Sequence, residues 1–276
     1  MKLALSVRVA EGFREKRSAT ATLDELAQIA TENGYSALCM RASQIGTHTP
    51  PEDVSRARQT VDKAGLAISM VTGDFPIPEN DDVRGPEALR DIVPYLDLAD
   101  ALGSDLLRVC IKEASDIPYV QRSSDQAAER GLRLVHPCHT RSLFEEVDRS
   151  LDVLASIDRT NFGLTYEPAN LNFAGQDYGI RTIRRFAPYI FNVYLQNHRI
   201  HPTGAHTMGT WCRGDVPHDH IPMWEEGLPF DSILAALADA GFDGYVTVHQ
   251  AFASLSGPAE AASRSADYLR SIAHFD

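Results

Sequence analysis

The chain repeats one pattern along almost its whole length: a short run of strand-forming residues, and then a helical stretch that ends at a glycine. Glycine at such a point supplies the left-handed backbone conformation that closes a helix, and the apolar runs that follow are rich in strand formers. These closures are Asn33-Gly34, Ala64-Gly65, Leu102-Gly103, Arg130-Gly131 and Ala240-Gly241. The pattern predicts eight strands, near residues 2–9, 35–41, 66–72, 105–111, 132–138, 161–167, 190–197 and 244–250.

Helical stretches separate these strands, and several have start signals. Thr22 with Glu25 and Ser142 with Glu145 have capping-box spacing, and Thr49 precedes Pro50 and Glu52 in the same way. The predicted helices lie near residues 22–33, 51–64, 85–102, 117–130, 142–157, 177–187, 230–240 and 258–273.

Strand–helix alternation requires parallel strands with right-handed crossovers. Eight units in roughly 250 residues is the size of a closed (β/α)8 barrel. A doubly wound open sheet is the alternative, but no GxGxxG motif follows the first strand. We therefore expect an α/β fold, a single TIM barrel domain over residues 1–276. The long segment 198–229 after the seventh strand holds both tryptophans, and we expect it to be a lid or a dimer contact.

Composition narrows the class of protein. The formal net charge of −12 disfavours binding to nucleic acid phosphates. No run of 18 apolar residues suggests a membrane span, and four widely spaced cysteines without a CxxC pair are typical of reduced thiols. We expect a soluble cytoplasmic protein without nucleic acid or membrane partners, which can form a homo-oligomer.

Active sites of such barrels lie at the carboxyl ends of the strands. His136, Glu167 and His249 fall at three of these ends. Two imidazoles and a carboxylate suit a divalent Mn, Co, Fe, Ni or Zn ion. The other interpretation is that each is a hydrogen-bonded residue of the rim with no metal.

Further histidines adjoin this predicted metal site. His198 is a candidate fourth ligand, although Gln196 or Tyr194 could take its place. His139 lies three residues after His136, so we expect it either to orient a metal ligand or to face the substrate. In the long loop, His218-Asp219-His220 is a candidate for a second ion.

Basic side chains at other strand ends indicate an anionic or polyhydroxylated substrate, because arginine pairs well with carboxylate and phosphate oxygens. Alternatively, Arg108 pairs with a buried carboxylate inside the barrel, for which Asp74 is a candidate. The predicted substrate-binding residues are Arg41, Arg108, Lys112, Arg199 and Gln196.

Three segments carry a family resemblance: Gly163-Leu164-Thr165-Tyr166-Glu167-Pro168-Ala169-Asn170-Leu171, Asn192 to Asn197, and the ending Trp224 to Asp231 followed by Gly241 to Val248. They resemble the xylose-isomerase-like barrel superfamily of sugar isomerases, epimerases, dehydratases and apurinic-site endonucleases. The resemblance spans nearly the whole chain and implies its barrel fold.

The resemblance also implies a metal set of Glu, Asp, His and Glu on strands five to eight. The matching positions here are His136, Glu167, Tyr194 (or its neighbours Gln196 and His198) and His249. Both glutamates of the family are histidines in this chain, and the aspartate is a glutamate. Because imidazole is itself a metal ligand, we expect a nitrogen-rich metal site made of His136, Glu167, His249 and His198.

The leading hypothesis is therefore a metal-dependent isomerase or epimerase of a sugar, keto-sugar or sugar acid, in which His139, His198 and Glu167 are the catalytic residues. A lyase or dehydratase shares the first step of that chemistry. A non-catalytic sugar-binding or partner-binding barrel is the alternative from another class. An endonuclease is a third, disfavoured by the charge.

Overall fold

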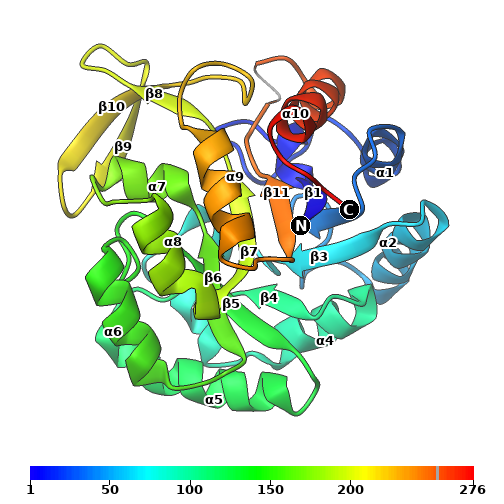
Figure 1. Cartoon of the computed structure of the whole chain (residues 1–276). Helices are drawn as coiled ribbons and strands as arrows, with labels where there is room; N and C mark the ends of the chain where they lie inside the picture. The colour runs from blue at the N-terminus through cyan, green and yellow to red at the C-terminus, as the bar shows by residue number, and fades with distance from the viewer. Residues whose placement is uncertain (253–254) are drawn as a thin grey trace.

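The computed structural model describes residues 1–252 and 255–276, and its centre is a closed barrel of parallel strands, which confirms the predicted TIM barrel fold (Figure 1). Each predicted strand segment contains one barrel strand. Around the barrel the order is β1-β11-β7-β6-β5-β4-β3-β2. The strands are β1 (Lys2–Ser6), β2 (Ala37–Met40), β3 (Ala67–Val71), β4 (Leu106–Arg108), β5 (Arg133–Pro137), β6 (Phe162–Tyr166), β7 (Ile190–Leu195) and β11 (Tyr245–Val248).

Helices surround the barrel, and the five glycines predicted to end helices all have positive φ angles, with Gly103 at 67°. Within the described residues, no helix combines the length and the apolar content that a bilayer crossing needs. The α-helices are α1 (Leu23–Glu32), α2 (Pro51–Lys63), α3 (Pro76–Glu79), α4 (Val93–Leu102), α5 (Ile117–Ala128), α6 (Val147–Ile157), α7 (Pro168–Phe173), α8 (Ile180–Phe186), α9 (Phe230–Asp239) and α10 (Pro258–Ile272). The 3-10 turns are η1 (Val7–Ala10), η2 (Gly85–Leu89), η3 (Ala114–Asp116) and η4 (Ala187–Tyr189).

Of the three predicted helix caps, one is confirmed and two are wrong, although α2 does begin at the predicted position. Thr22 and Glu25 form the expected capping box of α1. Thr49 instead accepts a hydrogen bond from the backbone of Gly46, and α2 begins after Pro50. Ser142 does not cap α6, which begins only at Val147, because the Ser142 hydroxyl donates to the carbonyl of His139. The stretch predicted as one helix over 85–102 is split into η2 and α4.

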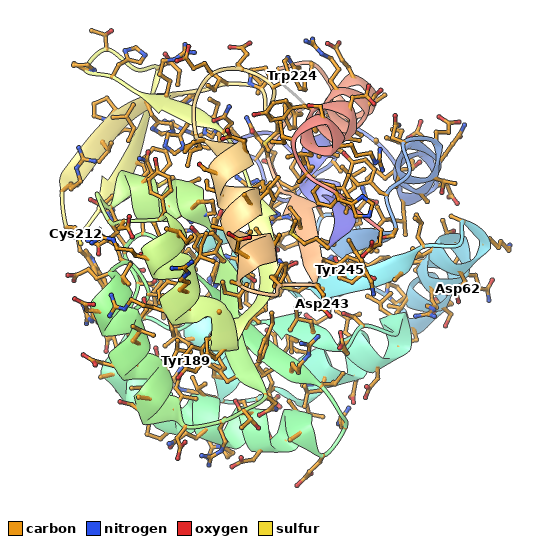
Figure 2. The ribbon with its side chains drawn as sticks, viewed as in Figure 1. Asp62, Tyr189, Cys212, Trp224, Asp243 and Tyr245 are labelled. Carbon is orange, nitrogen blue, oxygen red and sulfur yellow. The ribbon has the colours of Figure 1, made fainter. Side chains whose placement is uncertain are left out.

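The segment after β7 folds into a separate three-stranded antiparallel sheet, which stands at the upper left of the barrel in Figure 1. Its strands are β8 (His198–Ile200), β9 (His206–Thr210) and β10 (Gly214–His220), in the order β8-β10-β9. Figure 2 shows Cys212 at the end of the β9–β10 hairpin. We call this sheet the lid sheet.

Alternation along the barrel strands decides which side chains point inward. Cys39, Met70, Leu106, Val135 and Tyr194 form a buried cluster of their own, separate from the large core between strands and helices. The Cys39 thiol lies 3.3 Å from the Tyr194 hydroxyl, although β2 and β7 are not neighbours, so these side chains meet inside the barrel. A residue two positions further along the same strand also points inward, closer to the carboxyl end of the barrel.

Candidate active site

A cavity of about 500 Å³ opens at the carboxyl ends of the barrel strands. From the barrel it is lined by Arg8, Arg108, Glu167, Gln196 and His249. Arg108 and Gln196 follow Leu106 and Tyr194 of the inward-facing layer by two positions, so they point into the same end of the barrel. Arg8, Glu167 and His249 lie one or two residues after the ends of β1, β6 and β11. The loops after the strands and the lid sheet supply the rest of the wall, including Phe13, Lys16, Asn80, Lys112, His139, Asn170, Thr207, Met208 and Gly209.

Glu167 is a buried carboxylate in the wall of this cavity. It is 3% exposed, and its Oε1 accepts a 2.6 Å hydrogen bond from Nε2 of Gln196. Burial raises the pKa of Glu167 to about 7, even though the positive charges of Arg108, Arg8 and Lys16 oppose that shift. A carboxyl group with such a pKa can both accept and release a proton near neutral pH.

His249 is buried at the end of β11, and two contacts fix its ring. Its Nδ1 lies 3.0 Å from Oγ of Ser6, and its ring stacks on Tyr194 with centroids 3.5 Å apart. Burial, together with the charges of Arg8, Arg41 and Arg108, holds the pKa of His249 well below 6.5. The imidazole is therefore neutral at physiological pH.

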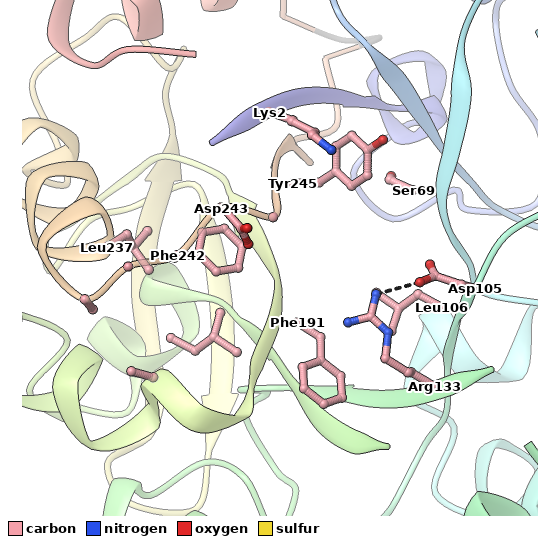
Figure 3. Close-up of a pocket in the computed structure, with 15 residues that line it drawn as sticks. Lys2, Ser69, Asp105, Leu106, Arg133, Phe191, Leu237, Phe242, Asp243 and Tyr245 are labelled. Atoms are coloured by element: carbon pink, nitrogen blue, oxygen red, sulfur yellow. Dashed lines mark hydrogen bonds and ion pairs between the residues drawn. The ribbon is translucent and has the colours of Figure 1, made fainter. Parts of the chain in front are cut away.

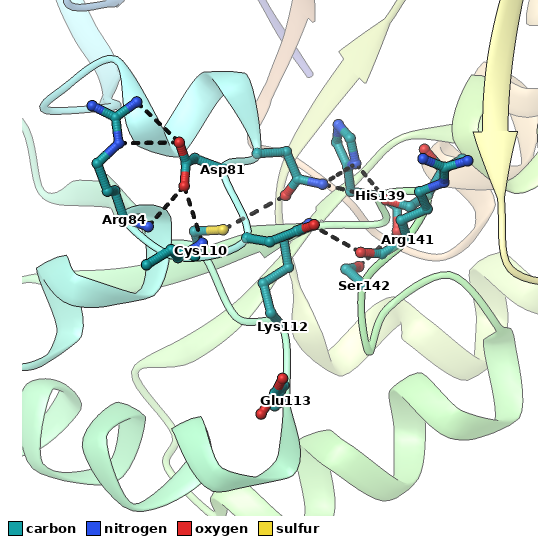
Figure 4. Close-up of polar contacts among 12 residues, drawn as sticks. Asp81, Arg84, Cys110, Lys112, Glu113, His139, Arg141 and Ser142 are labelled. Atoms are coloured by element: carbon teal, nitrogen blue, oxygen red, sulfur yellow. Dashed lines mark hydrogen bonds and ion pairs between the residues drawn. The ribbon is translucent and has the colours of Figure 1, made fainter.

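The side wall of the cavity is a polar network around Lys112 and His139 (Figure 4). Lys112 donates to the carbonyl of Arg141 over 3.0 Å and pairs with Asp82 over 2.8 Å. Nδ1 of His139 lies 3.1 Å from the Asn80 amide nitrogen. Burial and the charge of Arg108 hold the pKa of His139 well below 6.5, so it too is a neutral imidazole.

The cavity is positively charged in a chain whose net charge is −12. Its acidic side chains are Glu79, Asp82 and Glu167, and its cationic ones are Arg8, Arg14, Lys16, Arg108, Lys112 and Arg141. This local excess of positive charge fits the anionic substrate that the sequence predicts.

The predicted metal ligands do not come together. His136 adjoins the inward-facing Val135, so it points outward and stacks on Phe144 in the helix layer, with centroids 4.7 Å apart. His198 begins the lid sheet, where it stacks on Phe173 and bonds to Asn172 over 2.8 Å. Only Glu167 and His249 of the four line the cavity.

The residues at this site consequently do not fit the divalent ion that the family resemblance implies. Among residues 1–252 and 255–276, no group of three or more His, Cys, Asp or Glu side chains is arranged to hold a metal ion. The donor set also opposes one, because the guanidinium groups of Arg8 and Arg108 line the same cavity and repel a cation.

Some of the predicted substrate-binding residues line the cavity and others lie outside it. Arg108, Lys112 and Gln196 line the cavity, whereas Arg41 and Arg199 do not. Arg41 forms a fully buried ion pair with Glu11. Arg199 is exposed and donates to the carbonyl of Glu226.

Arg108 does not pair with a buried carboxylate. Its one described hydrogen bond is a long one, 3.4 Å, to the carbonyl of Ile77. Asp74, the partner considered from the sequence, accepts instead from the Tyr95 hydroxyl.

Sequence reasoning missed Arg8, Lys16 and Asn170. Arg8 lies inside the predicted strand 2–9, two residues after the observed end of β1, and Asn170 lies three residues after the predicted strand 161–167. Active-site residues of barrels are common at such strand ends, so both positions could have been found. Lys16 lies in an irregular loop, and its Nζ donates to the carbonyl of Pro78 over 3.0 Å. Nothing in the sequence pattern places that amine in the cavity.

Four histidines gather where the lid sheet meets the β1–α1 loop, and we call His198, His206, His218 and His220 the histidine cluster. The Nε2 atoms of His218 and His220 are 3.4 Å apart, and the Phe13 ring lies tilted against that of His220 with centroids 3.9 Å apart. Asp219 turns away to His201, so the candidate second ion site lacks its carboxylate.

A second cavity of about 410 Å³ lies at the opposite end of the barrel, where the strands begin (Figure 3). Lys2, Arg133 and Tyr245 open their strands there, and Arg133 pairs with Asp105 over 2.8 Å. This amino end of a TIM barrel serves stability rather than catalysis.

The closed barrel thus defines a protein of the TIM barrel class with a polar cavity at the carboxyl ends of its strands. The model of the xylose isomerase-like TIM barrel family matches residues 27–272, and the chain belongs to that family.

Solved structures agree in fold. A probable 3-DHS dehydratase from Bacillus anthracis is 16% identical, with a TM-score of 0.69 and coverage of 98% of this chain and 99% of that one. D-allulose 3-epimerase from Methylomonas sp. in complex with D-allulose is 16% identical, with a TM-score of 0.68 and coverage of 99% and 97%. A xylose isomerase-like TIM barrel protein from Mycobacterium smegmatis in complex with magnesium is 14% identical, with a TM-score of 0.71 and coverage of 98% and 96%. No curated protein matches the chain.

Proposed function

We propose that this chain is an isomerase or epimerase that moves a proton on a small sugar-like or acidic substrate, with Glu167 as the proton-transferring group. The observation that carries the proposal is the state of Glu167: buried in the barrel mouth, hydrogen-bonded to Gln196, and with a pKa raised to about 7 by burial. Active sites are where such shifts concentrate. The epimerase and the dehydratase among the similar structures support this class of chemistry.

The first step is removal of a proton from the carbon next to the substrate's carbonyl group. The ionised Glu167 accepts that proton, and Gln196 holds its Oε1 in place. The electron pair moves into the carbonyl, which becomes an enediolate oxygen. The positive charge of Arg108 and a hydrogen bond from a neutral imidazole, His139 or His249, stabilise that oxygen. Return of the proton from Glu167 to another carbon gives isomerisation, and delivery of a proton to the opposite face by a second acid of the cavity gives epimerisation.

A lyase is the second candidate, and Lys16 is the observation that favours it. Burial and the charges of Arg8 and Arg41 lower the pKa of Lys16 to about 7. An ammonium group with that pKa can protonate a hydroxyl that leaves from the carbon next to the carbanion. Loss of water would then replace return of the proton, and the first step on Glu167 would be the same.

Solvent exchange tests this proposal because both chemistries share proton removal. Keto-sugars, sugar acids and sugar phosphates are incubated with the protein in D2O, and the loss of each substrate C–H signal is followed by NMR. We expect exchange or conversion of at least one compound with the wild type and none with Glu167→Gln. Glu129→Gln, an exposed substitution of the same type, is the matched control.

The opposite result is also informative. If compounds stabilise the protein without any exchange, the non-catalytic sugar-binding barrel is correct. If Glu167→Gln exchanges protons as fast as the wild type, Glu167 is not the base.

A further inference from the structure

Two buried arginines lack the partners that buried charges require. Arg8 is 8% exposed and Arg108 is 4% exposed. The Nε atoms of both are closed to solvent without a hydrogen-bond partner. Among the described residues, the Arg8 side chain makes no hydrogen bond or ion pair, and Arg108 makes only the 3.4 Å contact with Ile77. Leaving a buried charge unpaired is costly, and the described part of the fold supplies no carboxylate partner for either group.

Repulsion among the buried arginines also indicates that a negative charge is missing from this cavity. Burial and the neighbouring charge of Arg41 lower the pKa of Arg8 to about 10, and Arg108 adds to the effect. Arg8 and Arg108 line one cavity, together with the Asn170 amide, whose nitrogen and oxygen are both buried without a partner. A ligand with negative charge and several oxygens would satisfy all of these groups at once.

We infer that Arg8 and Arg108 take the place of the family's metal ion, and that the substrate is a sugar-sized organic acid whose carboxylate or phosphate oxygens lie between the two guanidinium groups. Each guanidinium presents a planar fork of N–H donors, which matches carboxylate and phosphate geometry. A cavity of about 500 Å³ holds a monosaccharide-sized molecule. This inference rests on the proposed function, since it names the substrate of the same site.

The anion site also explains how Glu167 acts without a Lewis acid. An acid group held by Arg8 and Arg108 at the barrel centre presents its neighbouring carbon toward Glu167, which lines the same wall. Charge that develops on oxygen when the proton leaves is then already surrounded by fixed positive groups. Asn170, His139 and Lys16 are left to bind the hydroxyl groups.

Binding to metal-stripped protein tests the inference. The protein is dialysed against EDTA, and calorimetry and thermal shift are measured at neutral pH with D-gluconate, inorganic phosphate and neutral D-glucose. We expect gluconate or phosphate to bind and raise the melting temperature, and glucose to do neither. Binding of gluconate alone identifies a carboxylate, and binding of phosphate alone identifies a phosphate. Equal binding of glucose, or binding only after addition of Mn²⁺ or Zn²⁺, would overturn the inference.

Variants assign the binding to the two arginines. Arg8→Gln and Arg108→Gln should each raise Kd by about 10- to 100-fold, the loss that one charge-assisted contact carries. Arg181→Gln removes the same charge from a side chain that is 84% exposed and should leave Kd unchanged. Wild-type affinity in both cavity variants would contradict the inference. If either fails to fold, Arg8→Lys and Arg108→Lys keep the charge but lose the fork, and they too should bind more weakly.

Two readouts separate this inference from the proposed function. Glu167→Gln should lose proton exchange but keep the oxyanion affinity, so loss of activity with intact binding affects only the function. Without ligand, Arg8→Gln should melt at a higher temperature than the wild type, because it removes an unpaired buried charge. A merely structural arginine would give a lower melting temperature.

Discussion

Arg41 donates two hydrogen bonds of 2.8 Å to the two carboxylate oxygens of Glu11, and neither side chain reaches solvent. Burial opposes ionisation of Glu11, but the charge and hydrogen bonds of Arg41 outweigh it and hold the pKa of Glu11 below its ordinary value. The pair ties the end of β2 to the loop that carries Phe13 and Lys16. Arg41 therefore positions the loop that lines the cavity and does not itself line the cavity.

Breaking this ion pair should destabilise the protein. Arg41→Met leaves a buried, uncompensated carboxylate, and we expect a loss of about 3–5 kcal/mol of unfolding free energy. The double variant Arg41→Met/Glu11→Leu should recover much of that loss. Urea denaturation of the three proteins measures both effects. Unchanged stability of Arg41→Met would mean that the buried pair is not what holds this loop.

Activity should rise with pH through the pKa of Glu167. Its raised pKa, about 7, means that the carboxyl is protonated and inactive as a base below that pH and ionised above it. Gln196→Leu removes the hydrogen bond that favours the ionised form, so the rising limb should move to higher pH. The pH profile of proton exchange measures this shift, and infrared titration of the carboxyl band gives the same pKa independently of turnover. A limb that stays in place in Gln196→Leu would count against Glu167 as its origin.

The histidine cluster should make the protein sensitive to acid. Burial lowers the pKa of His198 to about 3 and that of His220 to about 2, both well below the value of an unfolded chain. The unfolded state therefore binds more protons, and stability that is complete above about pH 6.5 is lost as the pH falls toward the folded-state pKa values. His198 alone contributes a slope of up to about 1.4 kcal/mol per pH unit in that window.

A substitution isolates this contribution. His220→Phe keeps a ring against Phe13 and removes one titrating group, so its melting temperature should fall less between pH 7 and pH 5 than that of the wild type. His274→Gln changes a side chain that is 90% exposed and should keep the wild-type dependence. Equal acid sensitivity in His220→Phe would place its origin elsewhere.

Glu145 should anchor the outer end of the lid sheet. This buried carboxylate accepts hydrogen bonds from the backbone amides of Trp211 over 3.0 Å and Cys212 over 2.8 Å, and from that of Arg141. Glu145→Ala leaves these donors unpaired, and a cost of about 1–3 kcal/mol would speed amide hydrogen exchange at the hairpin by about 5- to 150-fold. Mass spectrometry of exchanged peptides checks this.

The neighbouring residue supplies the control. Glu146→Ala alters an exposed side chain that makes no capping hydrogen bond to α6, so exchange at the hairpin should not change. If amide exchange at Trp211 and Cys212 in Glu145→Ala is as slow as in the wild type, other contacts hold the hairpin.

The eightfold alternation was sufficient to predict the barrel. Glycine closures and strand-forming runs depend only on nearby residues, and eight alternating strands and helices then fix a parallel closed sheet. The site was harder to predict. Glu167 and His249 line the cavity as expected because the strand ends converge, but His136 was assigned to the mouth although it is one residue out of phase with Val135. A shift of one position reverses the direction of a strand side chain, and strand ends predicted to within a few residues do not resolve it.

The lid sheet could not be predicted for a different reason. Its register depends on pairing between β8 and β10, where His218 faces Ile200 across a gap of many residues. Ser142 and Glu145 have the spacing of a helix start, yet Glu145 bonds to the far end of that same sheet. Long-range contacts override a local pattern in both cases.

A very short piece of chain joins the lid sheet to β7, and it carries the hydrogen-bond partner of Glu167. β7 ends at Leu195 and β8 begins at His198, so only Gln196 and Asn197 lie between barrel and sheet. Asn197 is fixed by hydrogen bonds to Pro222 and Glu225, while Gln196 holds Glu167. A displacement of the sheet large enough to turn this linker would pull the amide of Gln196 away from Glu167. Such a movement would remove a hydrogen bond that favours the ionised carboxylate and would thereby raise the pKa of Glu167.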